Sequence, residues 1–140
     1  MSIWFKNYTL DDTRKFVPNT ILEHIGIELT ELTENTISGK MPVDHRTKQP
    51  AGILHGGASV VLAESLGSVA SVLVVDLEKH TCVGLEINAN HIRPVSKGWV
   101  YGTATPIHIG GKTHIWEIKI TNEQGKLVCI SRLTCAVLPK

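Results

Sequence analysis

The feature that most constrains the fold is an apolar stretch from Ala58 to Val75, eighteen residues that carry one charged side chain, Glu64. That length reaches the threshold for a transmembrane helix. However, four serines and one glycine interrupt the stretch, and a carboxylate at its middle would cost about 2.5–3.5 kcal/mol on insertion into a bilayer. A helix that is apolar on nearly every side is also typical of a buried core helix. We therefore expect a long core helix and no membrane span.

Apolar residues recur at every second position on both sides of this helix, which predicts strands. Before the helix, one alternation starts at Ile25 and another runs from Ile37 to Val43, so we expect a hairpin that turns at residues 34–35. After the helix, the same period predicts strands over residues 83–90, 99–109, 113–121 and 127–138, with an interruption at Pro106 and a tight turn at residues 122–125.

These elements predict an α+β architecture in which one long helix, beginning near Gly56, crosses one face of a five- to six-stranded antiparallel sheet. The first strand after the helix must cross the sheet, because its hairpin partners come later in the sequence. Two short helical segments are expected before the sheet, from a Thr9 cap to about Phe16 and over residues 21–24. No linker or repeat divides the chain, so we expect residues 1–140 to form a single domain.

Composition excludes several classes of protein and site. The 14 Lys and Arg residues against 13 Asp and Glu leave a formal charge of +1 without charge runs, whereas a nucleic-acid binder needs clustered cations. Three cysteines without close spacing favour free thiols, and seven histidines show no zinc-ligand spacing, so no metal is expected. The amino-terminal residues lack the pattern of a secretory signal, which together with the free thiols favours a cytoplasmic location.

The start of the long helix is a candidate binding site. Gly56 and Gly57 leave the first backbone amides free of side chains, and those amides have no partner inside a helix. With the helix dipole they can bind an anion or polarise a carbonyl oxygen that is becoming one. A tight turn with close packing would equally explain the two glycines.

Glu64 is the second candidate, because it is the one ionisable residue between His55 and Asp76. If the helix is buried on all sides, desolvation should raise the pKa of this carboxyl towards the range useful for acid–base chemistry. Ser68 lies four residues further on, on the same helical face, and could hold a water or the carboxylate. The alternative is a structural carboxylate that reaches the sheet edge or pairs with a cation.

Gly56 and Glu64 are too far apart to act on one carbonyl group within a single chain. Eight residues of helix separate them by about 12 Å, whereas an attacking group must come within about 3–3.5 Å of the carbonyl carbon. Two such helices, side by side and antiparallel, would bring Gly56 of one chain opposite Glu64 of the other. This predicts a two-fold dimer with two sites at its interface.

The segments at residues 54–57, 63–65 and 83–91, with Gln49 upstream, resemble the hotdog-fold acyl-CoA thioesterases. The similarity extends from Trp4 to Leu138 and is closest to the branch of the phenylacetate-pathway and dihydroxynaphthoyl-CoA thioesterases. That family implies a helix wrapped by an antiparallel sheet, homodimers that share a continuous sheet, and often homotetramers.

The resemblance also implies roles for individual residues. Glu64 matches the nucleophile or general base, Gly56 the amide that polarises the carbonyl, Gln49 and His55 polar neighbours of that carbonyl, and Ser68 a helper on the facing helix. The positions matching the part of the family site that binds substrate and coenzyme A are Gly84, His91, Ile92, Arg93, Pro94, His108, Ile109, Gly110, Gly111, Lys112 and Thr113.

Two positions depart from close relatives. Ala51 stands where they often carry Phe, which would reshape the acyl pocket, and Lys112 stands where some carry Arg, which would make a phosphate contact less directional. Independently of the resemblance, five basic or imidazole side chains near strand ends could form a cationic rim for phosphates, and solvated strand ends would explain them equally: His91, Arg93, His108, Lys112 and His114.

The expected function is hydrolysis of an acyl-CoA thioester, with coenzyme A as part of the substrate and no separate cofactor. The branch favours aryl or hydroxyaryl acyl groups, and the choice between a covalent anhydride and attack by water stays open. Two alternatives remain: a hydratase or dehydratase acting on a thioester with His55 and Glu64 as acid and base, and a non-catalytic acyl-CoA sensor.

Overall fold

The computed structural model describes all 140 residues, which form three helices and six strands. In chain order these are α1 (Leu10–Arg14), α2 (Ile21–His24), β1 (Glu28–Leu32), β2 (Ile37–Val43), α3 (Gly56–Val74), β3 (His80–His91), β4 (Gly98–Ile109), β5 (Thr113–Thr121) and β6 (Leu127–Pro139).

Most expected elements are confirmed, and three boundaries are wrong. The strand expected over residues 83–90 begins three residues earlier, at His80. The helix expected to reach Phe16 ends at Arg14. The strand expected from Ile25 begins three residues later, because Ile25 is the C-cap of α2 and Gly26 turns the chain with a φ of 80°. The irregularity expected at Pro106 is confirmed as a shift in the register between β4 and β5.

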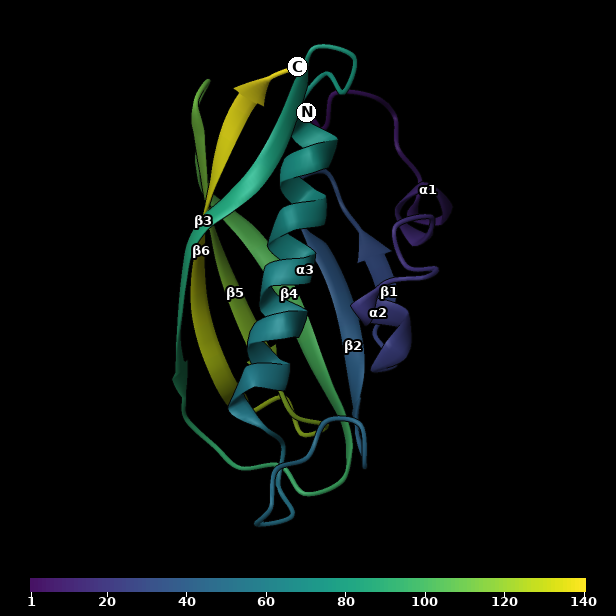
Figure 1. Ribbon diagram of the computed structural model, residues 1–140, viewed down its shortest axis with the longest axis vertical. Coiled ribbons are helices and arrows are strands. Elements are labelled where there is room, and N and C mark those ends of the chain that lie inside the picture. The colour runs from purple at the N-terminus through teal and green to yellow at the C-terminus, as the bar shows by residue number, and fades with distance from the viewer.

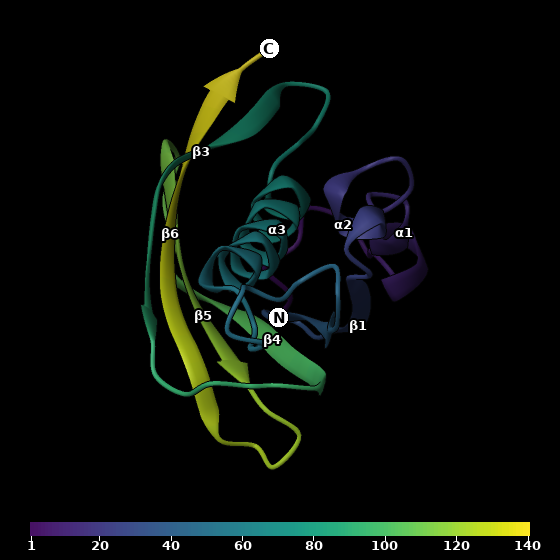
Figure 2. The ribbon, with the colours of Figure 1, turned by 60° about the horizontal axis from the view of Figure 1, so that its bottom comes forward.

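All six strands form one antiparallel sheet in the order β1-β2-β4-β5-β6-β3. The strand after the long helix does cross the sheet, since β3 pairs with β6, the last strand of the chain. β3 therefore ends the sheet, and its outer edge has no partner strand. Figures 1 and 2 show the sheet as a curved layer wrapped around α3, which runs along its concave face.

The helix approaches the sheet closely because two glycines face it. Gly39 of β2 and Gly102 of β4 are paired in register, and a Cβ on them would lie 3.1 and 2.9 Å from side-chain carbons of Leu66. Leu66, Leu62 and Leu73 of α3 are buried here in the core. Strand and helix thus interlock at the middle of the sheet, which sets the position of α3.

A buried polar contact holds the C-terminal half of α3 on β5. The Ser71 hydroxyl accepts a hydrogen bond from Trp116 Nε1 at 2.7 Å and lies 3.1 Å from His114 Nδ1. All three residues are buried. Trp116 also stacks on Trp4, with ring centroids 6.4 Å apart, so the amino-terminal segment joins the same core.

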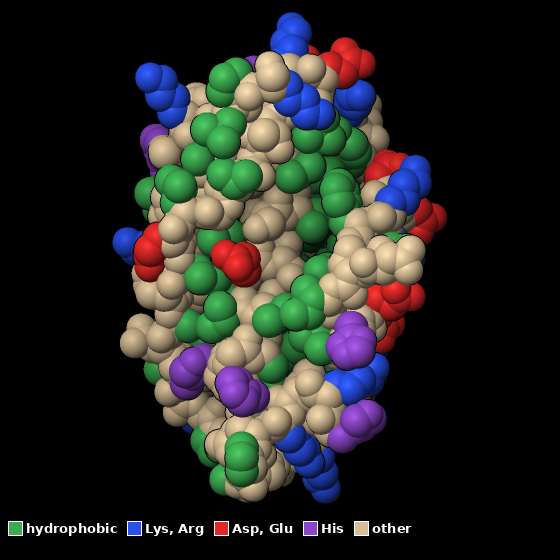
Figure 3. Space-filling model, viewed as in Figure 1, with side chains coloured by type: hydrophobic (Ala, Val, Ile, Leu, Met, Phe, Trp, Pro, Cys, Tyr) green, Lys and Arg blue, Asp and Glu red, His purple; other side chains and the backbone are tan.

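The expectation that α3 is buried on all sides is wrong for the single chain. By length and composition the helix could cross a membrane, and half of it is buried against the rest of the fold. Its other face carries Glu64, which is exposed, among residues that are half-buried. Figure 3 looks onto this face and shows one acidic side chain in a mostly apolar surround, beside a hollow.

Helices α1 and α2 lie beside α3 on the side of β1 (Figure 2). Both begin at a threonine N-cap, and Thr9 forms a full capping box with Asp12. These caps fix where the two short helices begin. Phe16, between them, and Ile21 and Leu22 of α2 form one wall of the hollow described below.

Candidate active site

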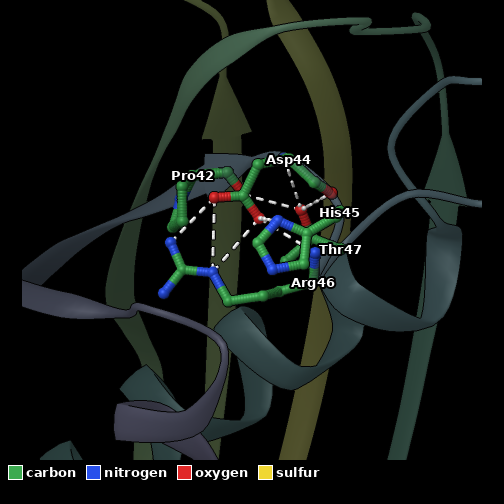
Figure 4. Close-up of polar contacts among 5 residues, drawn as sticks. All are labelled: Pro42, Asp44, His45, Arg46 and Thr47. Atoms are coloured by element: carbon green, nitrogen blue, oxygen red, sulfur yellow. Dashed lines mark hydrogen bonds and ion pairs between the residues drawn. The ribbon is translucent and has the colours of Figure 1, made fainter.

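The loop between β2 and α3 carries the first candidate residues and is held by its own polar contacts. The Thr47 hydroxyl donates to the carbonyl of Pro42 at 2.7 Å, and the Asp44 amide donates to Thr47 Oγ1 at 3.2 Å (Figure 4). Hydrogen bonds donated by Arg46, whose Nη2 lies 2.8 Å from the carboxylate, lower the pKa of Asp44 to about 2. These contacts fix the path of the chain into the residues that follow.

Gln49 lies in a tight turn closed by backbone hydrogen bonds to Gly52 and Ile53 at 2.9 Å each. Its side-chain oxygen accepts a hydrogen bond from the Ala51 amide. The side-chain NH2 group has no partner within the chain, so it is free to donate to a bound molecule.

His55 is the N-cap of α3 and is held in one tautomer by that role. Its amide donates to the Thr47 carbonyl at 2.8 Å, and its Nδ1 accepts from the Gly57 amide at 2.8 Å. Because Nδ1 is the acceptor, the ring proton sits on Nε2, which is available to a ligand on the exposed side of the residue.

The Gly56 amide is the free donor at this helix start. The Gly57 amide is taken by His55, and those of Ala58 and Ser59 bond to the His55 carbonyl, whereas the Gly56 N–H has no acceptor within the chain. A pocket of about 300 Å³ opens beside it. The pocket lining includes Gln49, Gly56, Ser59, His91, Ile92, Arg93 and Pro94.

Glu64 occupies a different pocket on the same helix. Its carboxylate is exposed in the single chain, so the burial expected from the sequence is absent there. It lies over β3, where a Cβ on Gly84 would be 3.1 Å from Glu64 Oε2. This second hollow, of about 390 Å³, is lined mainly by apolar residues of α2, α3 and the segment before α2, with Ser65 and Ser68 as polar members: Phe16, Ile21, Leu22, Val61, Glu64, Ser65, Ser68, Val69 and Val72.

Within one chain, the donor and the carboxylate do not meet. Gly56 and Glu64 lie on one regular helix, which separates them by about 12 Å, and they line separate pockets. Gln49 and His55 lie at the Gly56 end, and Ser68 lies with Glu64. The candidate catalytic residues thus form two half-sites.

The residues matched to substrate and coenzyme A binding likewise fall into separate groups. His91 to Pro94 lie at the end of β3 near Gly56, whereas the turn at residues 108–113 lies near the start of β3, about 26 Å away along that strand. Gly84 is level with the end of that turn, two strands away from it, and lies beside Glu64.

Of the two interpretations that the sequence left open for these side chains, a single cationic rim is therefore wrong for one chain. His91 and Arg93 lie at one end of the sheet, and His108 and Lys112 lie at the other. His114 is buried against Ser71, and burial, with a smaller effect of nearby His108, lowers the pKa of its imidazole.

No group of three or more His, Cys, Asp or Glu side chains lies close enough together to hold a metal ion. The three cysteines are free, and two of them are buried. Burial raises the pKa of the Cys82 thiol to about 11, so this residue is a poor nucleophile near neutral pH.

A family model described as the thioesterase superfamily matches residues 51–129, which is more than half of the chain. The chain belongs to the thioesterase superfamily. This confirms the resemblance that residues 54–57, 63–65 and 83–91 carry, the hotdog arrangement of helix and sheet, and the assignment to a family of thioester-hydrolysing enzymes.

Known proteins match along nearly the whole chain. A Vibrio cholerae protein named as an esterase is 58% identical to this chain, over 98% of this chain and 91% of the Vibrio protein. The 1,4-dihydroxy-2-naphthoyl-CoA hydrolase of Escherichia coli is 46% identical over 97% of this chain and 99% of its own. A crystal structure of a mutant thioesterase from Pseudomonas aeruginosa has a TM-score of 0.96 at 47% identity, covering 99% of this chain and 100% of that one.

Sequence reasoning missed one part of this thioesterase-superfamily site, the wall that faces α3. Phe16 and Ile21 line the Glu64 pocket although both are partly exposed to solvent. The available signal was their apolar character beside a helix break, where a solvated turn would carry polar residues. Ser59, at the Gly56 pocket, was also missed, because serine within a helix is common.

Proposed function

We propose that this chain hydrolyses an acyl-CoA thioester to a free acid and coenzyme A, in sites shared between two copies. The observation that carries the proposal is the pair of half-sites on α3: an unpaired Gly56 amide in one pocket and the Glu64 carboxylate in another. A thioester needs both at once, one on its carbonyl oxygen and one at its carbonyl carbon.

A second copy supplies what one chain lacks. β3 is a strand of twelve residues with an unpaired outer edge and the exposed apolar side chains of Val83 and Leu85, which is a surface suited to strand pairing. A two-fold axis beside it would set the α3 helices antiparallel and cover their exposed faces. Gly56 of one copy would then face Glu64 of the other.

The same axis would reunite the residues matched to coenzyme A. Because it reverses the direction of the partner's strands, the turn at residues 108–113 of one copy would lie at the end of the sheet where His91 and Arg93 of the other copy lie. Arg93 and Lys112 would then form one cationic region for the phosphates of coenzyme A. A tetramer would be a pair of such dimers.

The chemistry follows from the donors and the carboxylate. The thioester oxygen accepts from the Gly56 amide, near the free NH2 of Gln49 and the Nε2–H of His55. Glu64 attacks the carbonyl carbon, or removes a proton from a water that attacks it, with Ser68 near by to orient that water. The carbon–sulfur bond then breaks and the thiolate of coenzyme A leaves. After attack by Glu64 this leaves an acyl–Glu64 anhydride, which a water hydrolyses to the free acid and the restored carboxylate; after attack by water the acid forms directly and the proton taken up by Glu64 passes to the thiolate.

The acyl group is expected to be aryl or hydroxyaryl. The Glu64 pocket is mainly apolar, includes the aromatic ring of Phe16, and offers the hydroxyls of Ser65 and Ser68 without partners in the chain. The E. coli relative is named for a dihydroxynaphthoyl thioester, which is consistent with such a pocket.

A thiol-release assay over a panel of aryl-CoA and alkyl-CoA thioesters tests the proposal. We expect release with aryl esters, lowered by orders of magnitude in Glu64→Gln and little changed in the control Lys79→Gln, an exposed residue beyond the end of α3 that lies outside both pockets. Both variants should keep the circular dichroism of the native chain. Near-normal release by Glu64→Gln would refute the role of the carboxylate.

The same panel separates the other functions of this fold. Conversion of an enoyl-CoA to a hydroxyacyl-CoA without free thiol would indicate a hydratase. Binding of thioesters without release from any of them would indicate a sensor. Either result would replace hydrolysis as the function of the site.

A further inference from the structure

His91 lies against the free amide donor at the start of α3. A Cβ placed on Gly56 would be 2.6 Å from His91 Nε2, 3.0 Å from Cε1 and 3.1 Å from Cδ2. The face of the imidazole at Nε2 therefore rests on the Cα of Gly56. His91 is the last residue of β3, thirty-five positions further along the chain, so the contact joins two elements that are distant in sequence.

Glycine at position 56 is explained by this contact and not by backbone conformation. The glycines with positive φ are Gly26, Gly52, Gly98 and Gly125, so residue 56 has a conformation open to any amino acid. A side chain there would have to displace the imidazole. The close approach therefore keeps both the amide and the ring at the surface of one pocket.

The imidazole of His91 has no hydrogen-bond partner within the chain, and its side chain lines the same pocket of about 300 Å³ as Gly56 and Gln49. An oxygen that accepts from the Gly56 amide would lie in this pocket, next to the Nε2 edge. A neutral imidazole with its proton on Nε2 can donate to that oxygen. Donors aimed at a developing negative charge stabilise it most where water is excluded.

We propose that His91 is a second hydrogen-bond donor to the thioester carbonyl, acting beside the Gly56 amide, and that it does not serve the nucleotide of coenzyme A. The inference rests on the proposed thioester hydrolysis and adds a residue to its reacting end. No proton is transferred in this step: Nε2–H donates to the carbonyl oxygen as that oxygen gains charge, and the bond weakens when the thiolate leaves.

Arg93 provides the contrast within the same strand end. Its guanidinium donates to the Leu127 carbonyl at 2.8 Å, which directs it towards the β5–β6 connection, and it is exposed. It is a permanent cation at the pocket rim, suited to a phosphate and not to a carbonyl in the pocket. Two residues two positions apart are thus assigned to opposite ends of the substrate.

The test compares a full aryl-CoA ester with the N-acetylcysteamine thioester of the same acid, which has a thioester but no nucleotide. For His91→Ala we expect kcat/KM to fall by a similar factor, about 10–100-fold, on both esters. His91→Gln, whose amide can place a donor near the position of Nε2, should recover part of the loss. Arg93→Ala should raise KM for the aryl-CoA ester and leave kcat/KM for the short ester within about two-fold.

Loss on the aryl-CoA ester alone, or no loss on either ester, would overturn the inference, because a nucleotide contact or a packing role produces those patterns. Unfolding midpoints of the variants identify any loss that comes from misfolding, and His91→Gln then carries the comparison. Failure of the proposed function gives a different result: the native chain releases thiol from neither ester, or Glu64→Gln is as active as the native chain.

Discussion

Replacing Ser71 by alanine should destabilise the fold by removing the polar contact between α3 and β5. The hydroxyl is the acceptor for Trp116 Nε1–H at 2.7 Å and the partner of His114 Nδ1 at 3.1 Å, and none of the three residues is accessible to water. Alanine fills almost the same volume, so the change leaves the packing and removes the hydrogen bonds.

The size of the effect follows from the two groups that lose their partner. A buried donor or acceptor left unpaired costs about 1–3 kcal/mol, and His114 and Trp116 each lose one contact, so we expect a loss of about 2–6 kcal/mol. Alanine has the higher helix propensity, so the exchange of serine for alanine in a helix itself stabilises the fold by roughly 0.5 kcal/mol. Ser65→Ala makes the same exchange on the face of α3 that carries Glu64, where the half-buried hydroxyl has no partner in the chain, and serves as the control.

Urea unfolding at one fixed protein concentration, followed by tryptophan fluorescence and circular dichroism, measures the difference. Fixed concentration matters because a dimer gains apparent stability from association. We expect Ser71→Ala to be less stable than Ser65→Ala by about 2–6 kcal/mol. A difference below about 0.5 kcal/mol would show that the buried hydroxyl is not what holds α3 on the sheet.

Three further predictions concern packing, pH and the acyl pocket. Gly67→Ala should destabilise the fold by about 1–3 kcal/mol, although alanine has the better helix propensity, because the new Cβ would lie 2.6 Å from Leu133 Cδ2. In urea unfolding, Leu133→Val should partly restore the stability of Gly67→Ala. If the double variant loses the sum of the two single losses, the clash is not the cause. Burial lowers the pKa of His114 from its ordinary value of 6.5, so on acidification the unfolded chain binds this proton before the folded chain does. The free energy of unfolding should therefore be constant above pH 6.5 and should fall below it, by at most about 1.4 kcal/mol per pH unit. The fall should be shallower in His114→Asn, and an equal fall would refute the assignment. Phe16→Ala should change the ratio of kcat/KM between aryl and short alkyl thioesters by about ten-fold, and an unchanged ratio would remove Phe16 from the acyl pocket.

The periodicity of the chain was sufficient to predict the helix and the strands, because apolar spacing reflects which side of each element faces the core. It failed where tertiary contacts decide. Ile25 and Ile27 continue the alternation of β1 and are both buried, yet Ile25 caps a helix and Gly26 turns the chain between them.

The candidate site shows the same division. The spacing of Gly56 and Glu64 on one helix was readable in the sequence, and so was their inability to meet within one chain. Apolar composition could not show that Glu64 faces outward, because a helix face awaiting a partner and one packed in a core have the same residues. The contact of His91 with Gly56 depends on how far β3 extends, which no local pattern records.

His114 was misplaced although a signal was present. It shares the inward parity of Trp116, Ile118 and Ile120 in β5, all of which are buried. The alternation along β5 predicts that His114 lies in the core, as it does. The interpretation that put His114 in a cationic rim relied on its polar character alone. The structure reconciles the two, since Ser71 supplies a partner for a neutral imidazole.

Subunit complementation tests most directly whether two chains share each site. Glu64→Gln removes the carboxylate, and Gly56→Pro removes the amide hydrogen at a helix position where proline is favoured, after a residue with φ −70° and ψ 131° that suits it. Gly56→Ala is the matched control, because it adds the same Cβ beside His91 and keeps the amide.

We expect Glu64→Gln and Gly56→Pro to be inactive alone and Gly56→Ala to retain more activity than Gly56→Pro. When the two inactive chains are unfolded together and refolded in equal amounts, half of the dimers are mixed, and each mixed dimer has one intact site of two. Thiol release should then return to about a quarter of the native level. No release above that of the separate variants would contradict a site built from Glu64 of one chain and Gly56 of another.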